Sequence, residues 1–554
     1  MCNSLRLITD GLPSASDAAL RRALIRLLTE RGVAATDGEE ADYTVDLTLD
    51  DTLRADRYLI RPRTDGASLR AASICACFAA IGKLLRMSAF DGAGSFTPPI
   101  VPVDFTPKSP VRGMYFATHF HNFYHNAPIE RVYDVIEDLA LRGANSLLVW
   151  FDMHHYSSMA DPAARAHAAR LREILTYANT VGLGGALTML SNEGFSESPK
   201  HLRAEWEAQN GYFARPDSHY HVEICPSKEG GIEEILRQRR EMLSFFRDLR
   251  IDYIVYWPYD QGGCTCEKCT PWGANGFLRL LPHFKALIRE EMPDTRVIVS
   301  TWYFDRFIHD EWKAFLPQVG DDTFADVPYL MSFFFRGEVP EEVRAYADRP
   351  DAIPQISFPE ISMYSCVPWG GYGASVLTNF LETTHQKTAA LYHGGYPYSE
   401  GIFEDANKFI QLGLFSGDFA HAADALRAYV RFTFCCADET ICEELFEAIR
   451  RTETALARTR TRTEEGIRVT IEDTTDIDFV YETLQKYNTT LPKSVTQAPA
   501  FRLFYLRSII DREIVRNDGY ANRSAAAQAA MREINVIYHA DDQTLHCVKA
   551  PVGL

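Results

Sequence analysis

The feature that most constrains the fold is a repeat of eight short apolar runs between residues 111 and 404, most of them followed by a helical pattern. Strands that alternate with helices are typical of a parallel sheet. Eight such units in roughly 290 residues favour a (β/α)₈ TIM barrel, with an open doubly wound sheet as the alternative. The eight runs cover residues 113–119, 146–152, 184–190, 253–260, 296–302, 329–335, 353–360 and 389–395.

A smaller unit precedes the repeat, in a chain whose 554 residues allow about three domains. We expect residues 1–107 to form a small α/β domain. It ends in a proline-rich linker over residues 95–110, through which a helix cannot run. The predicted elements of this domain are helices over 17–31 and 68–87 and strands over 43–49 and 58–61.

A helical unit follows the barrel. With the barrel assigned to residues 108–404, residues 405–554 predict a helical C-terminal domain that packs against it. The arginine-rich stretch 450–465 alternates in charge, which predicts a solvated helix face. The clearest helical patterns in this part cover residues 420–434, 439–459 and 500–515.

Charge and composition exclude several classes of function. Lys and Arg number 57 against 75 Asp and Glu, so the net charge is −18. Nucleic acid and anionic membranes are poor partners for such a chain. The start of the chain does not resemble a signal peptide, and the longest weakly polar run, 71–82, is too short to span a bilayer. We therefore expect a soluble cytoplasmic protein without an organic cofactor, and a homodimer remains open.

In a barrel of this kind the site lies at the carboxyl ends of the strands. Many aromatic and carboxylate side chains follow the predicted strands, and five of the seven Trp do so. Aromatic faces stack on sugar rings and carboxylates bind hydroxyls, so this rim favours a carbohydrate, although any large barrel carries some rim aromatics. The predicted binding residues are His119, His121, Asp152, His155, Trp257, Trp302, Tyr303, Arg336, Trp369, Tyr398 and Glu400.

Asp260 and Glu360 are the predicted catalytic pair. Each follows an apolar run directly, and a carboxylate that leaves such a strand into an aromatic pocket has the raised pKa of a general acid. The alternative is a rim salt bridge with Arg306 or Arg336. Glu400 is the next candidate, although it could equally bond a backbone group at the start of the following helix. The rim histidines predict hydrogen bonds to substrate rather than a catalytic metal.

Four cysteines form a sharper pattern. Cys264, Cys266 and Cys269 follow the fourth predicted strand as C-x-C-x-x-C, and Cys225 follows the third strand. Four thiolates make a closed, structural zinc site, which would pin the loop after the fourth strand. Reduced thiols, or a disulfide in an exported protein, are the alternatives.

The arrangement resembles glycoside hydrolases related to family 20 β-N-acetylhexosaminidases and family 67 α-glucuronidases. VRGMYF at the first strand is similar to the Arg-Gly of the hexosaminidases, which implies that Arg112 binds sugar hydroxyls. YSEGIFEDANKF resembles a segment of the α-glucuronidases, which covers Glu400, Asp405 and Asn407. WPYDQGGCTCEKC resembles a segment of bacterial glycosidase-like domains with a Cys-rich loop.

The resemblance implies an exo-acting glycoside hydrolase with Asp260 as general acid and Glu360 as base or nucleophile. A uronic acid or an N-acetylhexosamine is the implied terminal sugar. Hexosaminidases carry an Asp-Glu pair after the fourth strand, where this chain has Asp260-Gln261, and glutamine cannot act as the acid. There are two alternatives. One is a substrate-assisted N-acetylhexosaminidase in which Asp260 orients the acetamido group and another residue is the acid, and the other is a non-catalytic carbohydrate-binding barrel.

Overall fold

The structure is a computed structural model of the whole chain. It describes residues 1–36, 40–118, 122–207, 222–259, 263–362, 374–456, 458–463, 466–471, 474–517 and 524–539, with side chains except within 458–471 and at 538–539. Among these residues, no helix is both long and apolar enough to cross a membrane.

Eight parallel strands close into a barrel, which confirms the predicted fold class. They pair in the order β10-β11-β12-β13-β14-β15-β16-β9, and β9 pairs back to β10. A short ninth strand, β17, extends the edge of β9 beyond β16. The bounds are β9 Val111–Phe116, β10 Ser146–Trp150, β11 Gly184–Leu190, β12 Ile251–Trp257, β13 Arg296–Ser300, β14 Leu330–Ser332, β15 Gln355–Ser357, β16 Tyr392–Gly395 and β17 Tyr398–Ser399.

The strands read as continuous apolar runs because both of their faces are buried. Leu148, Ala186 and Val255 belong to the cluster that fills the barrel interior. Their neighbours Leu147 and Leu187 belong to the larger cluster shared with the surrounding helices. The helices of this layer are α3 Phe123–Asn126, α4 Ile129–Leu141, α5 Pro162–Thr180, α6 Gly231–Leu243, α7 Gly276–Glu291, α8 Glu311–Phe315, α9 Glu341–Ala347, α10 Thr378–Thr388 and α11 Asp405–Ser416.

The N-terminal domain is a mixed sheet with strand order β2-β1-β3-β5-β4-β8. The predicted helix over 68–87 is wrong in its first part, where β5 runs instead, because Ala67, Leu69 and Ala71 alternate as the buried face of a strand. Ser73 then caps the helix that follows. The bounds are β1 Ser4–Asp10, α1 Ser14–Glu30, β2 Ala34–Ala35, β3 Tyr43–Leu49, β4 Tyr58–Arg63, β5 Gly66–Ala71, α2 Ile74–Met87 and β8 Val103–Phe105.

The last part of the chain is helical, as predicted, except for one hairpin. The predicted helix over 439–459 ends at Arg451, and the arginine-rich stretch continues as a strand, since its alternating Thr residues favour an extended chain. The bounds are α12 Ala422–Thr433, α13 Glu439–Arg451, β18 Arg458–Thr463, β19 Gly466–Ile471, α14 Thr475–Thr490, α15 Lys493–Thr496, α16 Pro499–Arg516 and α17 Ala525–His539.

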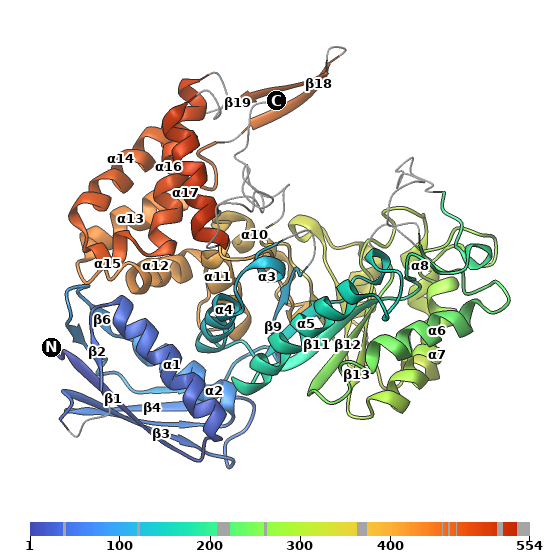
Figure 1. The fold of residues 1–554 in the computed structure, drawn as a ribbon, viewed down its shortest axis with the longest axis horizontal. Coiled ribbons are helices and arrows are strands. Elements are labelled where there is room, and N and C mark those ends of the chain that lie inside the picture. The colour runs from blue at the N-terminus through green and yellow to red at the C-terminus, as the bar shows by residue number, and fades with distance from the viewer. Residues whose placement is uncertain are drawn as a thin grey trace.

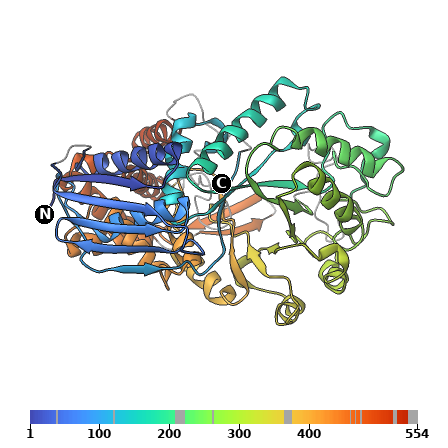
Figure 2. The ribbon, with the colours of Figure 1, turned by 90° about the horizontal axis from the view of Figure 1, so that it is seen from below.

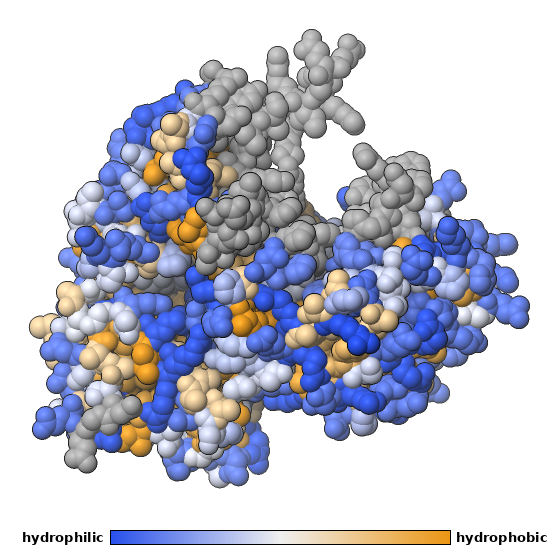
Figure 3. Space-filling view, viewed as in Figure 1, coloured by the Kyte–Doolittle hydropathy of each residue, from blue (hydrophilic) through white to orange (hydrophobic). Residues whose placement is uncertain are grey.

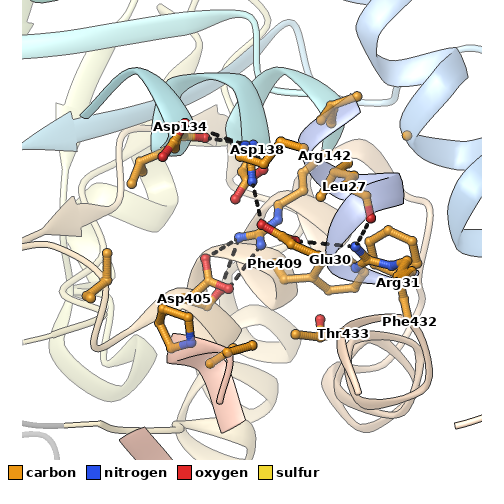
Figure 4. A pocket seen from close by; sticks show the side chains of 18 of the residues that line it. Leu27, Glu30, Arg31, Asp134, Asp138, Arg142, Asp405, Phe409, Phe432 and Thr433 are labelled. Carbon is orange, nitrogen blue, oxygen red and sulfur yellow. Dashed lines mark hydrogen bonds and ion pairs between the residues drawn. The ribbon is translucent and has the colours of Figure 1, made fainter. Parts of the chain in front are cut away.

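The N-terminal domain and the C-terminal helices pack on the same flank of the barrel (Figures 1 and 2). Their junction encloses a cavity of about 190 Å³ whose charged walls are paired. Arg142 at the end of α4 reaches Asp405 of α11 across it at 2.6 Å (Figure 4). Arg26 of α1 pairs with Asp138 of α4 at 2.6 Å. The first pair joins two helices of the barrel layer, and the second joins the N-terminal domain to the barrel.

Hydrophilic side chains cover most of the described surface on the face shown in Figure 3, and the hydrophobic residues there are scattered in small groups. This agrees with the formal net charge of −18. Scattered apolar residues of this kind are ordinary on the surface of a folded protein.

Candidate functional site

An aromatic cluster lines the barrel at the carboxyl ends of the strands. Trp257 ends β12 and Trp302 follows β13, and their ring centroids lie 5.5 Å apart. Phe358, which follows β15, packs edge-on against both rings at 4.8 and 5.3 Å. Tyr115 of β9 contacts Phe358 at 5.4 Å and stacks on Tyr398 of β17 at 5.5 Å. These five rings, which we call the aromatic floor, form the apolar surface that a ligand pocket needs.

Two predicted site carboxylates, Glu360 and Glu400, lie beside Tyr398 at the edge of this floor. Glu360 pairs with Tyr398 in a parallel β-bridge and is 7 % exposed. The Tyr398 hydroxyl donates a hydrogen bond of 3.0 Å to Glu400 Oε1. Burial raises the pKa of this hydroxyl, and the charges of Glu400 and Glu360 raise it further. The two carboxylates therefore act on one phenol from the ends of neighbouring strands.

Glu400 differs from an ordinary surface carboxylate in its pKa. Burial raises this pKa to about 8, and the charge of Glu404 contributes in the same direction. At pH 7 the Glu400 carboxyl is therefore mostly neutral, which is the protonation state that a proton donor needs.

Glu404 is a functional neighbour that the sequence analysis missed. Glu404 Oε1 accepts hydrogen bonds from the backbone N–H groups of Glu400 and Gly401, at 2.7 and 2.9 Å, and from the Ser399 hydroxyl at 2.6 Å. The spacing of Glu404, four residues from Glu400, is the only signal for this role in the sequence.

The ends of β10 and β11 contribute a cluster of histidines and carboxylates. Asp152 is 3 % exposed and lies 3.1 Å from His155 Nε2 and 3.3 Å from His167 Nδ1. His154 Nδ1 lies 2.6 Å from Glu193 Oε1, and the same oxygen accepts the His154 backbone N–H. Burial lowers the pKa of His167, which favours its neutral form. Asp152 and His155 were predicted from the rim rule, whereas the pairing of Asp152 with His167 of α5 and that of His154 with Glu193 were not.

This second cluster can perform two kinds of chemistry. Asp152, His154 and His155 each offer one ligand atom, and these atoms lie within 4.8 Å of one another, close enough to share an ion. A carboxylate that hydrogen-bonds one ring nitrogen of a histidine, as Glu193 does with His154, commonly orients the ring so that the other nitrogen can bind a metal or a substrate. The same groups can bind sugar hydroxyls, which is the role that the sequence analysis favours.

Asn192 connects the two loops that follow β11 and β12. Its side-chain amide donates to the carbonyl of Ile224 at 3.1 Å and to the carbonyl of Gly263 at 2.9 Å. Asn192 is 1 % exposed, so both bonds are shielded from water. Asn192 therefore links the loop after β11 to the loop after β12 through Gly263.

Glu311 of α8 anchors the loop after β12 from the other side. It accepts the Tyr259 hydroxyl at 2.6 Å and the Gly273 backbone N–H at 2.8 Å. Burial raises the pKa of Glu311 to about 8. Tyr259 immediately precedes Asp260 in the chain, so Glu311 fixes the residue before the predicted general acid.

The four cysteines predicted as metal ligands come together in space. Cys225 Sγ lies 3.8 Å from Cys266 Sγ and 3.9 Å from Cys269 Sγ, and all four sulfur atoms, with that of Cys264, lie within 4.8 Å of one another. Hydrogen bonds from the neighbouring thiols lower the pKa of Cys225, and the same bonds raise the pKa of Cys269. The cluster is a candidate metal site.

Arg112 lies at the amino end of β9, away from the aromatic floor. Its guanidinium donates to the carbonyls of Gly143 and Ser109, both at 2.8 Å, and pairs with Asp56 of the N-terminal domain at 2.7 Å. The role in sugar binding that the resemblance implied for Arg112 does not agree with this position. The residue instead joins two domains.

In the segment that resembles the α-glucuronidases, one residue lies at the candidate site and two have structural contacts elsewhere. Asp405 lies at the domain junction, as described above. The Asn407 amide donates to the carbonyl of Ile361, and its oxygen accepts the Leu377 N–H, both at 2.8 Å. Glu400 is thus the member of this segment that reaches the rim.

Two further predicted residues follow β13 and β14. Tyr303 is half-buried, and its ring lies 4.5 Å from that of Trp302, beside the aromatic floor. Arg336 is exposed, and its carbonyl accepts a hydrogen bond from Lys387 of α10 at 3.1 Å. Tyr303 therefore lies with the site, whereas Arg336 lies on the surface.

Four predicted residues, Asp260, His119, His121 and Trp369, lie outside the described residues. Their roles remain predictions.

The sequence matches no family model, and no curated protein is similar to it in sequence. Solved structures do match its fold. A family GH115 4-O-methyl-α-glucuronidase with specificity for decorated arabinogalactans has a TM-score of 0.60 at 10 % identity, covering 99 % of this chain and 78 % of its own.

A GH89 enzyme from Clostridium perfringens, solved with GlcNAc-α-1,4-galactose, has a TM-score of 0.59 at 11 % identity, covering 95 % of this chain and 64 % of its own. The GH20 β-N-acetylhexosaminidase from Streptomyces coelicolor has a TM-score of 0.53 at 13 % identity, covering 79 % of this chain and 91 % of its own. The chain therefore shares the fold of glycoside hydrolases of several families.

Proposed function

We propose that the protein is an exo-acting glycoside hydrolase that removes a terminal sugar with a pair of carboxylates. The observation that carries this proposal is that Glu360 and Glu400 both lie beside Tyr398, a ring of the aromatic floor, at the carboxyl ends of the barrel strands. The fold shared with glycoside hydrolases supports the same conclusion.

The proposed roles combine the sequence prediction for Asp260 with the position of Glu360 beside Tyr398 and the raised pKa of Glu400. Glu360 is the base or nucleophile, and Asp260 is the general acid that protonates the leaving oxygen. Glu400 is the second candidate for the acid, because its pKa of about 8 keeps its proton at neutral pH. Trp257, Trp302 and the rest of the aromatic floor hold the ring of the terminal sugar.

The terminal sugar that we propose is a uronic acid or an N-acetylhexosamine. The names of the similar structures support both, since one is an α-glucuronidase and another a β-N-acetylhexosaminidase. The Asp152–His155 and His154–Glu193 pairs supply donors and acceptors for the hydroxyl or carboxylate groups of such a sugar.

The first test is hydrolysis of a panel of nitrophenyl glycosides of both anomers, with uronides, N-acetylhexosaminides and neutral sugars. Proton NMR of an active reaction then shows retention or inversion. The expected carboxylate separation is about 5–5.5 Å for a retaining enzyme and about 6.5–9.5 Å for an inverting one. A chain that binds these sugars and turns none over would instead be a carbohydrate-binding barrel.

Variants then separate the roles. Glu360→Gln should lower turnover by at least the roughly 10²–10⁴-fold of a lost acid or base while sparing binding. Unchanged turnover in this variant would contradict the assignment. Asp260→Asn and Glu400→Gln are compared on nitrophenyl and dinitrophenyl glycosides. Because a dinitrophenolate leaves without a proton, the variant that recovers on this substrate has lost the general acid.

A further inference from the structure

Four cysteine sulfur atoms from two loops meet beside the catalytic end of the barrel. Cys225 follows β11 and Cys264, Cys266 and Cys269 follow β12, so residues about 40 positions apart converge on one point. We propose that these four thiolates bind one Zn²⁺ ion in a closed tetrahedral site. This inference does not depend on the proposed hydrolase activity.

The spacing of the sulfur atoms fits a tetrahedral ion. Zinc–thiolate bonds of about 2.3 Å place the sulfur atoms of a tetrahedron about 3.8 Å apart. The distances from Cys225 Sγ to Cys266 Sγ and Cys269 Sγ are 3.8 and 3.9 Å. A disulfide would need sulfur atoms about 2.05 Å apart, so the same spacing excludes a formed disulfide between these pairs.

The surroundings of the sulfur atoms also fit a metal site that is closed to water. Cys225, Cys264 and Cys269 are each at most 1 % exposed, and Cys266 is half-buried. The Ser227 hydroxyl lies 3.0 Å from Cys269 Sγ and can donate to it as a thiolate. Hydrogen bonds of this kind to ligand atoms orient them around structural ions. Four thiolates leave no open position for substrate or water, so the ion is structural.

The backbone around the cluster is arranged to hold the ligands in place. The Cys269 N–H donates to the Cys266 carbonyl at 2.9 Å, which closes a tight turn between these two ligands. The Cys225 N–H donates to the Leu202 carbonyl at 2.8 Å. The Thr265 N–H donates to the Glu205 carbonyl, also at 2.8 Å. Three segments of chain therefore meet around the sulfur atoms, and one ion can fasten all of them.

The ion would position the loop that carries the predicted general acid. Trp257 ends β12 before this loop, and Cys264 follows Asp260 in the sequence, so the ion would fix the chain on the far side of Asp260 from the strand. Asn192 adds a further tie, since it bonds the Gly263 carbonyl next to the ligand Cys264. The zinc is thus a support for the rim and takes no part in the reaction.

The direct test is elemental analysis of the full chain, purified without a polyhistidine tag and dialysed against a chelator. We expect one zinc per chain. Cys266→Ser should lower zinc affinity by at least the roughly 10–100-fold that follows loss of an outer partner of a metal ligand. Cys442→Ser is the matched control, because Cys442 is buried in α13, outside the cluster, and its loss should leave the zinc content unchanged.

A second measurement covers the case in which the cysteine variant fails to fold. The unaltered chain is prepared with Co²⁺ in place of zinc. Four thiolate ligands should produce an intense sulfur-to-cobalt charge-transfer band in the near ultraviolet and the visible bands of tetrahedral cobalt. Absence of both zinc and this spectrum, iron in place of zinc, or a mass that shows disulfides among the four cysteines would each overturn the proposal. An inactive chain that holds one zinc would overturn only the proposed function.

Discussion

Replacing Glu400 with glutamine should stabilise the folded protein at high pH and change its stability little near pH 4. The Glu400 side chain is half-buried, and its reduced hydration together with the charge of Glu404 raises its pKa to about 8. Above that pH the folded protein must hold a poorly hydrated negative charge. Glutamine cannot ionise, and its side-chain oxygen can still accept the hydrogen bond of the Tyr398 hydroxyl.

The sign follows from the direction of the shift. The pKa of Glu400 is raised in the folded state, so its contribution to stability is fully present below the ordinary value of 4.5 and is lost as the pH rises to about 8. About 1.4 kcal/mol per pKa unit sets an upper bound of about 5 kcal/mol on this loss. Structural relaxation and partial hydration reduce it, so we expect Glu400→Gln to be about 2–5 kcal/mol more stable than the parent at pH 9.

Thermal unfolding of the parent and the variant at pH 4, 7 and 9 measures this difference. Glu444→Gln is the control, because hydrogen bonds from Lys486 and Tyr487 lower the pKa of Glu444 and its loss should destabilise slightly at neutral pH. A Glu400→Gln variant whose stability relative to the parent does not rise with pH would refute the poorly hydrated, protonated carboxyl and its role as an acid.

Two further predictions concern the scaffold around the site. Arg142→Met leaves Asp405 without its ion-pair partner at the domain junction, and should cost about 3 kcal/mol in the free energy of unfolding. Arg349→Met, which breaks an exposed pair, should cost less than about 1 kcal/mol, and equal costs in urea unfolding would contradict this reasoning. Asn192→Leu removes two buried hydrogen bonds, one within the loop after β11 and one from it to Gly263 of the loop after β12, and should cost about 2–5 kcal/mol and lower turnover. An unchanged melting temperature in that variant would show that Asn192 does not hold Gly263 in place.

The architecture could be predicted because its signals are local. The barrel strands are short apolar runs, and a helical pattern follows most of them. In the strand over residues 43–49, apolar and polar residues alternate, as expected of a half-buried strand. The prediction was wrong where local signals conflict. The pattern predicts helix over residues 68–71, where the alternating burial belongs to β5. It also predicts helix over residues 452–459, whereas α13 ends at Arg451 and β18 begins at Arg458.

The candidate site could be predicted only in part. The rule that strand ends carry the site predicted Glu360, Glu400 and Asp152 as rim residues, and the C-x-C-x-x-C motif together with Cys225 after the preceding strand predicted all four clustered cysteines. The prediction that Arg112 binds sugar does not agree with its position at the amino end of β9, because a short motif does not show which end of the strand the side chain lies near.

The order of apolar and polar residues in the sequence determined the barrel, the small α/β domain before it and the helices after it, because strand and helix periods depend on neighbours along the chain. Only the tertiary structure decided that the pKa of Glu400 is raised, that His154 pairs with Glu193, and that Glu404 accepts the Glu400 N–H. These properties depend on burial and on distances between groups that folding alone brings together.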